Sequence, residues 1–253
     1  MYLKLAQAQF CTAWFNAWFL ARPGYYQERR HAPPCPIGGS TMASSGARRP
    51  ATTIGIIACG ALAQHVHRIS DRQHWPVRVY PLNAALHNHP GQIAGRVTEL
   101  AESARREHDV VLVAYADCGT YGALAQVCEA LDLPQLSGSH CYDVFAGAGR
   151  LADEFATEPA TYLLTDFLVR SFDRTVWRGL GLDRYPELRD DYFGNYRQVL
   201  WLAQHRTPAL QAAAERIADA LRLRLEIRDV GDLGLEAELR ALLVSAGYLV
   251  TDA

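Results

Sequence analysis

Three cysteines occupy positions where thiol chemistry is physically favoured. Cys59 directly follows the apolar run Thr53–Ala58, Cys118 comes soon after Val110–Tyr115, and each of the two precedes a glycine. Glycine permits a tight turn and the close approach of a ligand. Cys141 opens a further predicted helix. The unpaired N–H groups and the dipole of a helix N-terminus favour the thiolate, so we expect three activated thiols.

A metal ion is one reason to gather several thiolates. Soft sulfur ligands suit zinc or an iron–sulfur cluster. Three protein ligands with one open position are typical of a catalytic zinc or of a substrate-binding cluster. The pattern therefore predicts a metal site with Cys59, Cys118 and Cys141 as ligands, zinc as the metal, and an iron–sulfur cluster as the alternative. His140 precedes Cys141, and His87 follows the second predicted strand on the same edge, so both are further candidate ligands.

Two other interpretations of the cysteines stay open. Two thiols can work without a metal as an acid/base pair, as in a racemase, one removing a proton and the other returning it. Cysteines in buried turns can also bind nothing. Cys128 differs from the other three, because it lies within an apolar helical stretch and is expected to be a buried small hydrophobe.

Acidic residues lie beside the same strand ends. Asp117 precedes Cys118, and Asp166 stands where the predicted strand Thr161–Thr165 yields to a helix. Arg170 follows Asp166 by one helical turn and could pair with it or bind an anionic substrate. We expect Asp166, Asp117 and Arg170 to be the catalytic candidates, although aspartate is also a favoured helix N-cap.

The segment 178–195 interrupts the alternation of strands and helices. It is long, polar, aromatic and rich in glycine, which is typical of a lid or binding loop, although an ordinary surface excursion has the same composition. The expected substrate-binding residues of this lid are Asp190, Asp191, Tyr192 and Asn195.

The elements that must position these residues alternate in type. The predicted strands are Thr53–Ala58, Val77–Pro81, Val110–Tyr115, Thr161–Thr165, Val199–Ala203 and Arg224–Arg228. The predicted helices are Gly60–Ser70, Gly91–Glu107, Tyr121–Leu131, Asp166–Trp177, Pro208–Leu221 and Leu233–Ala246. This alternation predicts an α/β fold: a mostly parallel, Rossmann-like layered sheet with helices on both faces. Ligands of such sheets bind at the carboxyl ends of the strands. No dinucleotide fingerprint, phosphate-binding loop or nucleophile elbow is present.

The length and charge of the chain exclude several classes of protein. The chain has 253 residues, 49% hydrophobic and 21% charged, which suffices for a sizeable core. A formal net charge of −2 and dispersed basic residues argue against nucleic-acid binding, and no apolar run is long enough for a membrane span. The dispersed cysteines favour a reducing compartment, so we expect a cytoplasmic protein with a small-molecule substrate.

The first 52 residues do not follow the α/β pattern. They are rich in proline and glycine, and Met42 begins a short polar leader that runs into the first strand. We expect residues 1–52 to lie outside the fold, with translation starting at Met42, and residues 53–253 to form a single α/β domain.

Six short motifs in this order resemble those of domain-of-unknown-function family 1638, found in bacteria and archaea. They are Ile57–Ala61, Leu86–Asn88, Asp117–Thr120, His140–Tyr142, Leu164–Phe167 and Asp190–Tyr196. The resemblance covers roughly residues 53–246. Relatives in methane-forming archaea accompany corrinoid-dependent methyl-transfer genes, which implies one-carbon or methyl-group metabolism. The expectation is therefore a metal-binding enzyme of that metabolism. The alternative is a non-catalytic accessory protein that holds a metal or corrinoid for a methyltransferase.

Overall fold

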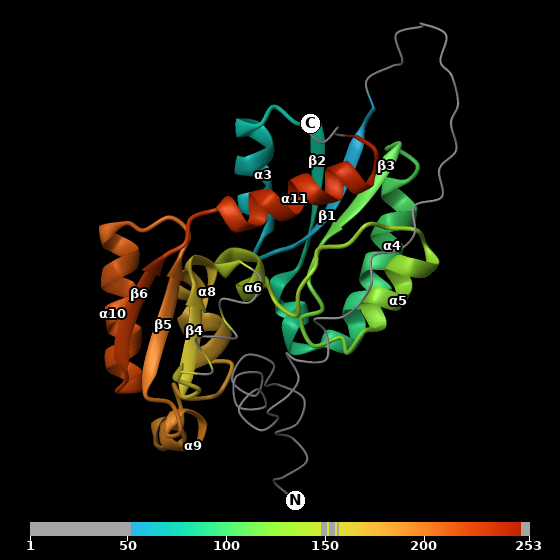
Figure 1. Ribbon diagram of the computed structural model, residues 1–253. Coiled ribbons are helices and arrows are strands. Elements are labelled where there is room, and N and C mark those ends of the chain that lie inside the picture. The colour runs from blue at the N-terminus through green and yellow to red at the C-terminus, as the bar shows by residue number, and fades with distance from the viewer. Residues whose placement is uncertain (1–51, 148–150, 152–154, 156, 249–253) are drawn as a thin grey trace, which may run out of the picture.

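The described residues of the chain form two parallel β-sheets of three strands each. The computed structural model describes residues 52–147, 151, 155 and 157–248. The first sheet has the order β2-β1-β3 and contains β1 (Ile54–Cys59), β2 (Val77–Leu82) and β3 (Val110–Ala114). The second has the order β4-β5-β6 and contains β4 (Thr161–Thr165), β5 (Gln198–Ala203) and β6 (Arg224–Asp229). The parallel α/β prediction is confirmed, but the strands belong to two sheets where one was expected (Figure 1).

Helices cover the first sheet on both faces. The crossovers β1–β2 and β2–β3 run in opposite directions, so right-handed connections place α3 (Ala63–Arg72) and α4 (Ile93–Ala104) on opposite faces. The last helix, α11 (Leu233–Ser245), returns from the second half of the molecule and contacts α3, while α5 (Ala123–Ala130) contacts α4 (Figure 1). Leucines of α11 are part of the same buried core as β1 and β3. The C-terminal helix therefore ties the two halves together.

The second sheet has a different covering. Its crossovers run in one direction, so α8 (Asp166–Phe172) and α10 (Pro208–Leu221) lie on one face and contact each other. The short helix α6 (Cys141–Ala146) contacts β5, and Ala146 packs with Leu163 and Leu200 in a separate small cluster. Helix α6 therefore lies between the two halves of the molecule.

Five further short helical segments connect the main elements or extend α8. A 3₁₀ pair, η3 (Ala84–Asn88) and η4 (Pro90–Gln92), follows β2, and a π-helical turn, η5 (Asp173–Trp177), continues α8. The 3₁₀ turn η6 (Pro186–Leu188) and α9 (Arg189–Phe193) lead into β5. No helix of the described residues is long and apolar enough to cross a membrane.

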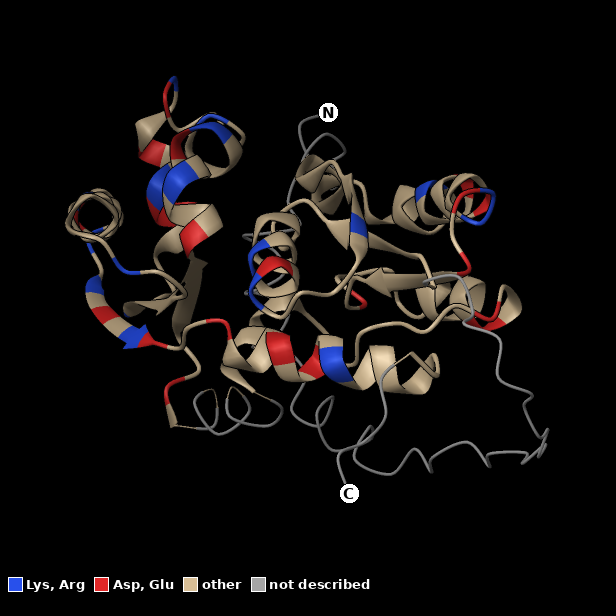
Figure 2. Ribbon diagram, turned by 90° about the horizontal axis from the view of Figure 1, so that it is seen from above, with Lys and Arg blue, Asp and Glu red and all other residues tan. Residues whose placement is uncertain are grey.

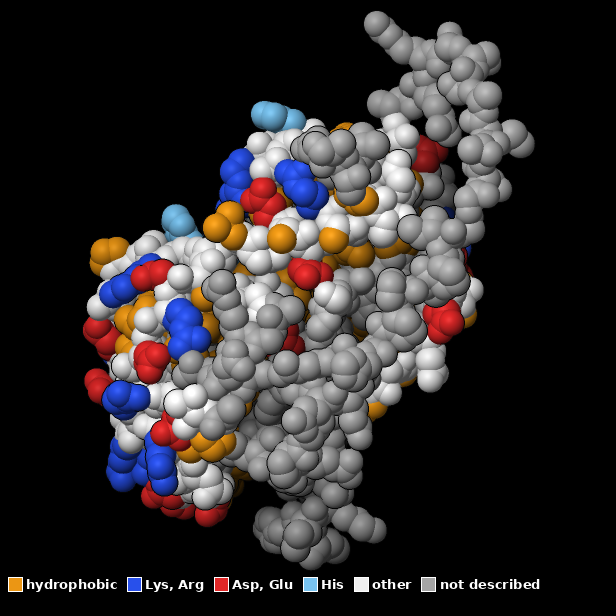
Figure 3. Space-filling model, in the orientation of Figure 1, with side chains coloured by type: hydrophobic (Ala, Val, Ile, Leu, Met, Phe, Trp, Pro, Cys, Tyr) orange, Lys and Arg blue, Asp and Glu red, His pale blue; other side chains and the backbone are white. Residues whose placement is uncertain are grey.

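Charges of both signs are interspersed over the molecule. Figure 2 shows basic and acidic positions alternating along the helices, and Figure 3 shows the same mixture over the half that contains β4–β6. Neither sign gathers into a single broad patch on the faces in view. The expectations for Met42 and for the first 51 residues lie outside the described part of the chain.

Candidate functional site

Cys59 is the last residue of β1 and is only 1% exposed. Gly60 behind it allows the chain to turn against β2, since a Cβ there would lie 2.4 Å from the carbonyl oxygen of Leu82. The glycine is therefore needed for close approach of two strand ends. This backbone contact places the Cys59 thiol beside the segment that follows β2.

His87 belongs to that segment and faces Cys59. Its Nε2 lies 3.8 Å from the Cys59 sulfur, while its Nδ1 lies 2.9 Å from the carbonyl oxygen of Ala84. A carbonyl only accepts hydrogen bonds, so Nδ1 carries a proton and donates it. Asn83 caps the 3₁₀ helix by accepting a hydrogen bond from the backbone N–H of Ala85. The imidazole is thus oriented from its far side, with Nε2 directed at the thiol.

Burial and thiolates act in opposite directions on His87. Burial alone lowers the pKa of the imidazole, but the negative charge and hydrogen bond of Cys59, the charge of Cys141 and the Ala84 carbonyl outweigh it. Together they raise the pKa of His87 to about 9. The arrangement therefore favours the protonated form of the His87 imidazole.

Cys118 stands in a strained turn after β3. Its φ is +46°, a left-handed conformation that non-glycine residues adopt rarely. The Asp117 carboxylate holds this turn, accepting hydrogen bonds from the hydroxyl of Thr120 at 2.6 Å and the backbone N–H of Gly122 at 2.8 Å. The backbone N–H of Cys118 donates to the carbonyl of Ser139 at 2.9 Å. That bond brings Cys118 to the start of α6.

Cys141 is the first residue of α6 and hydrogen-bonds to Cys118. The hydrogen bond from the Cys118 thiol lowers the pKa of Cys141, and the positive charge of His87 lowers it further against the effect of burial. The same hydrogen bond, together with burial, raises the pKa of Cys118. The proton of the pair therefore belongs to Cys118, and Cys141 is the thiolate.

These four side chains form what we call the thiol–imidazole cluster: Cys59, His87, Cys118 and Cys141. They come from four different segments, and the charges of Cys59 and Cys141 both act on His87. The cysteines are free thiols. Within the described residues, no three His, Cys, Asp or Glu side chains already have their donor atoms grouped around a metal position. The cluster is best described as two pairs, Cys59 with His87 and Cys118 with Cys141.

Tyr115 belongs to the same site although the sequence did not single it out. It is fully buried, its ring stacks on His87 with centroids 5.5 Å apart, and its hydroxyl oxygen lies 3.4 Å from Nδ1. Burial and the neighbouring thiolates raise its pKa, so the phenol stays protonated. Its position at the end of an apolar strand was the available signal.

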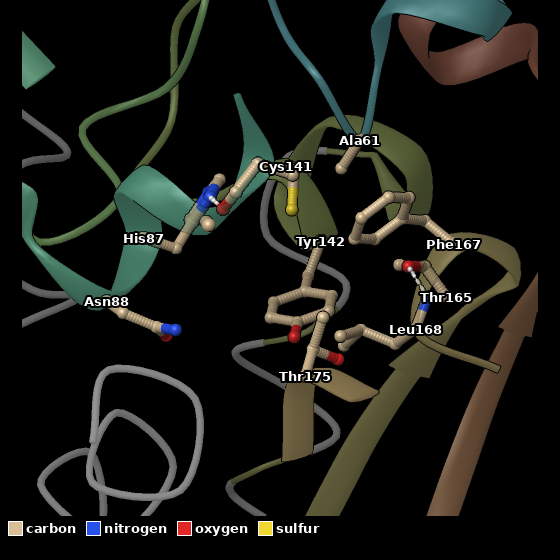
Figure 4. Close-up of a pocket in the computed structure, with 11 residues that line it drawn as sticks. Ala61, His87, Asn88, Cys141, Tyr142, Thr165, Phe167, Leu168 and Thr175 are labelled. Carbon is tan, nitrogen blue, oxygen red and sulfur yellow. Dashed lines mark hydrogen bonds between the residues drawn. The ribbon is translucent and has the colours of Figure 1, made fainter. Parts of the chain in front are cut away.

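A small pocket opens next to the cluster. It has a volume of about 60 Å³ and is lined from both halves of the molecule (Figure 4). The first half contributes His87 and Asn88 after β2, α6 contributes Cys141, and the second half contributes Phe167 and Leu168. In Figure 4 the Cys141 sulfur points toward this space. The carboxyl ends of strands from both sheets thus meet at the pocket, as open α/β sheets favour.

The lining of this pocket is mainly apolar. Alanine, phenylalanine and leucine side chains dominate it, and the polar groups beyond the cluster are threonines, one tyrosine and Asn88. Of the described residues that line it, none is Lys, Arg, Asp or Glu. A small, uncharged, largely apolar molecule matches this lining best.

Three other predicted site residues, Asp166, Arg170 and His140, have polar partners in the fold. The Asp166 carboxylate is completely buried and accepts hydrogen bonds from the Trp201 indole at 3.0 Å and the backbone N–H of His205 at 2.8 Å. Arg170 reaches it only at 3.8 Å. Asp166 therefore links the ends of β4 and β5 and does not line the pocket. His140 lies against Asp143, with Nδ1 3.4 Å from the carboxylate, and burial lowers its pKa.

The expected lid lies away from the cluster. Helix α9, with Asp190, Asp191 and Tyr192, comes directly before β5 and so lies at the amino edge of the second sheet (Figure 1). The pocket lies at the carboxyl edge. Asp190, Asp191 and Asn195 are exposed. The length and composition of this segment suggested a lid, but a connection that ends at the start of a parallel strand lies at the edge opposite that strand's carboxyl end.

The fold and the site define a class: a two-sheet parallel α/β protein with a partly buried thiol–imidazole cluster beside a small apolar pocket. The chain belongs to the family described as "Protein of unknown function (DUF1638)", whose model matches residues 81–238. That span contains His87, Cys118 and Cys141. The family resemblance stated from the motifs is confirmed. No curated protein and no solved structure matches the chain.

Proposed function

We propose that this protein is an enzyme that binds a soft transition-metal ion, zinc in the first instance, through Cys59, Cys118, Cys141 and His87. The observation that supports the proposal is that four possible soft donors from four separate segments lie as two pairs, Cys59 with His87 and Cys118 with Cys141, in one partly buried region. The 3.8 Å between the Cys59 sulfur and His87 Nε2 is close to the roughly 3.6 Å expected between a thiolate and an imidazole on one tetrahedral zinc.

Binding has to change the arrangement of the cluster. Since the described residues hold no ready group of three ligands, the Cys118–Cys141 pair must approach the Cys59–His87 pair when the ion enters. The ion also displaces the protons of His87 and Cys118, because ligands bind deprotonated. The imidazole orientation supports this role, since Nδ1–H is already held by a backbone carbonyl, as metal-ligating histidines require.

The pocket suggests what such a centre would act on. A Lewis-acidic ion at the cluster would face a small, mainly apolar space that offers no charged partner for an anionic substrate. A corrinoid ring is far too large for about 60 Å³, so any corrinoid would stay on a partner protein. The link to methyl-group metabolism rests on the association that the family resemblance implies. A non-catalytic metal carrier would use the same ligands but would show no turnover.

Competition with a chromophoric zinc chelator tests the metal proposal. We expect the full chain to take up one zinc ion, and Cys59→Ser and His87→Gln to weaken the affinity by at least about tenfold each. Cys128→Ser is the matched control, because this buried thiol lies in α5 outside the cluster. Equal affinity in all four proteins would overturn the proposal.

A second candidate function has its own observation. Cys118 and Cys141 share a hydrogen bond, and their pKa values move in opposite directions, which creates one acid and one base. Such a pair could move a proton on a substrate in the pocket without a metal. This candidate predicts that alkylation of Cys141 abolishes activity while removal of metal by chelators does not change it.

A further inference from the structure

We infer that Cys118 and Cys141 form a reversible disulfide, so that the site is switched by oxidation. The inference does not depend on the proposed metal, because it concerns the pairing of two thiols in the metal-free protein. The N–H of Cys118 donates to the carbonyl of Ser139 at 2.9 Å, and the N–H of Asp117 donates to Gly138 at 3.4 Å, so the two cysteine-bearing segments run side by side.

Cys118 and Cys141 interact with each other, whereas the other cysteines are engaged elsewhere. Cys118 and Cys141 are hydrogen-bonded to each other. Cys59 has its sulfur against His87 Nε2, and Cys128 lies within α5. A disulfide needs the sulfurs at about 2.05 Å, so the two side chains must move together when it forms. Among the four thiols of the described residues, Cys118 and Cys141 are therefore the pair expected to form a disulfide.

The two cysteines differ in their exposure to the pocket, so they are expected to take part in different steps of disulfide formation. Cys141 is half-buried and lines the pocket, whereas Cys118 is only 4% exposed and is not in the lining. A small disulfide that enters the pocket meets Cys141 first. Cys141 is then the attacking thiolate and Cys118 the resolving thiol.

The chemistry balances with a low-molecular-weight disulfide as oxidant. The Cys141 thiolate attacks one sulfur of the oxidant, forming a mixed disulfide and releasing one thiolate. Cys118, losing its proton to solvent, attacks the Cys141 sulfur and releases the second thiolate. The protein pair is oxidised by two electrons and the reagent is reduced to two thiols. The disulfide removes two donors from the thiol–imidazole cluster, so oxidation disables any chemistry that needs both.

Mass spectrometry of the full chain tests the inference. Reduced, chelator-treated protein is exposed to bis(2-hydroxyethyl) disulfide, and the remaining thiols are then alkylated. Trypsin leaves the three cysteines of residues 107–150 on one peptide, because no Lys or Arg lies between Arg106 and Arg150. Chymotrypsin, which can cut after Tyr121 and Leu131, separates them. We expect a cross-link between the Cys118 and Cys141 peptides, with Cys59 and Cys128 alkylated.

Variants distinguish the steps and keep the result independent of the metal. Cys118→Ser should trap the reagent on Cys141 as a stable mixed disulfide, and Cys141→Ser should leave Cys118 reduced. Cys128→Ser and Cys59→Ser should form the cross-link as the wild type does, although Cys59→Ser is expected to bind zinc more weakly. Alkylation of both Cys118 and Cys141 in the treated wild type, or a cross-link to Cys59 or Cys128, would overturn the inference.

Discussion

The sulfur of Cys59 lies 3.8 Å from Nε2 of His87, although 28 residues separate them in the chain. The contact exists because β1 and β2 are parallel neighbours in register, with Cys59 opposite Leu82. The residues that follow the two strands therefore lie at the same edge of the sheet. A thiol and an imidazole thus meet through sheet register, and the rest of the cluster is arranged around this pair.

The raised pKa of His87 predicts how the stability of the metal-free protein depends on pH. The folded pKa of about 9 exceeds the ordinary 6.5, so the fold binds the proton more tightly than the unfolded chain. This stabilisation is complete below about pH 6.5 and is lost as the pH rises through about 9. Urea unfolding between these values should show wild-type stability falling more steeply than that of His87→Gln. Parallel curves would contradict the coupling.

Asp166 is expected to matter for stability and not for metal binding. Asp166→Asn removes one carboxylate oxygen from a buried site that accepts from the Trp201 indole and two backbone N–H groups. We expect a loss of roughly 2–4 kcal/mol in the free energy of unfolding, with zinc affinity unchanged. Asp191→Asn, at an exposed position of α9, should leave the unfolding midpoint unchanged. A selective loss of zinc affinity in Asp166→Asn would return this residue to the site.

Gly60 is expected to tolerate no side chain. A Cβ there would lie 2.4 Å from the Leu82 carbonyl oxygen and 2.9 Å from the Ala84 nitrogen, both backbone atoms that cannot move aside cheaply. Gly60→Ala should therefore cost roughly 2–4 kcal/mol of stability and displace the segment that carries His87, lowering zinc affinity as well.

Gly95→Ala provides the matched control for this substitution. Gly95 lies within α4, and nothing lies within 4 Å of its added Cβ. Alanine there should stabilise the protein by about 0.5–1 kcal/mol, because glycine loses more conformational entropy in a helix. If both substitutions shift the unfolding temperature in the same direction, Gly60 is not needed for the close approach of β1 to β2.

Asp117 is expected to act by positioning Cys118. Its carboxylate accepts hydrogen bonds from Thr120 and from the backbone of Tyr121 and Gly122, which stabilises a turn where Cys118 has a positive φ. Asp117→Ala should slow formation of the Cys118–Cys141 disulfide, while reaction of Cys141 itself with a neutral alkylating agent stays unchanged. Asp117→Asn, which keeps one acceptor oxygen, should largely restore the rate. Equal rates in all three proteins would show that the carboxylate does not position Cys118.

The strands could be predicted because their apolar runs are short and bounded. Thr161–Thr165 has the predicted limits, and the other five differ by one residue at one or both ends. The helix over Pro208–Leu221 also has its predicted limits, since Thr207 supplies the N-cap and proline the first turn. The division into two sheets was not predictable in the same way. Lateral strand order depends on which faces pack together, and local patterns do not encode it.

The site was predictable where it depends on strand ends. Cys59 lies against His87, and Cys118 lies beside the start of α6, because parallel strands expose their carboxyl ends on one edge. Cys128 is buried in α5, where burial raises the pKa of its thiol to about 11. Tyr115 could not be separated from an ordinary core tyrosine before its hydroxyl was seen beside His87. Whether the segment 178–195 could act as a lid depends on which edge of the sheet it lies at, and the sequence alone did not show this.

Metal analysis of the full chain, purified without oxygen, tests the central claim most directly. Cobalt(II) loading adds a count of thiolate ligands, because sulfur-to-cobalt charge-transfer absorption grows with each bound thiolate. The account predicts one metal ion per chain and a charge-transfer intensity that falls by about one third in each of Cys59→Ser, Cys118→Ser and Cys141→Ser, as three sulfur ligands require. The intensity should not change in Cys128→Ser. Protein that binds neither zinc nor cobalt, or four variants with identical spectra, would contradict it.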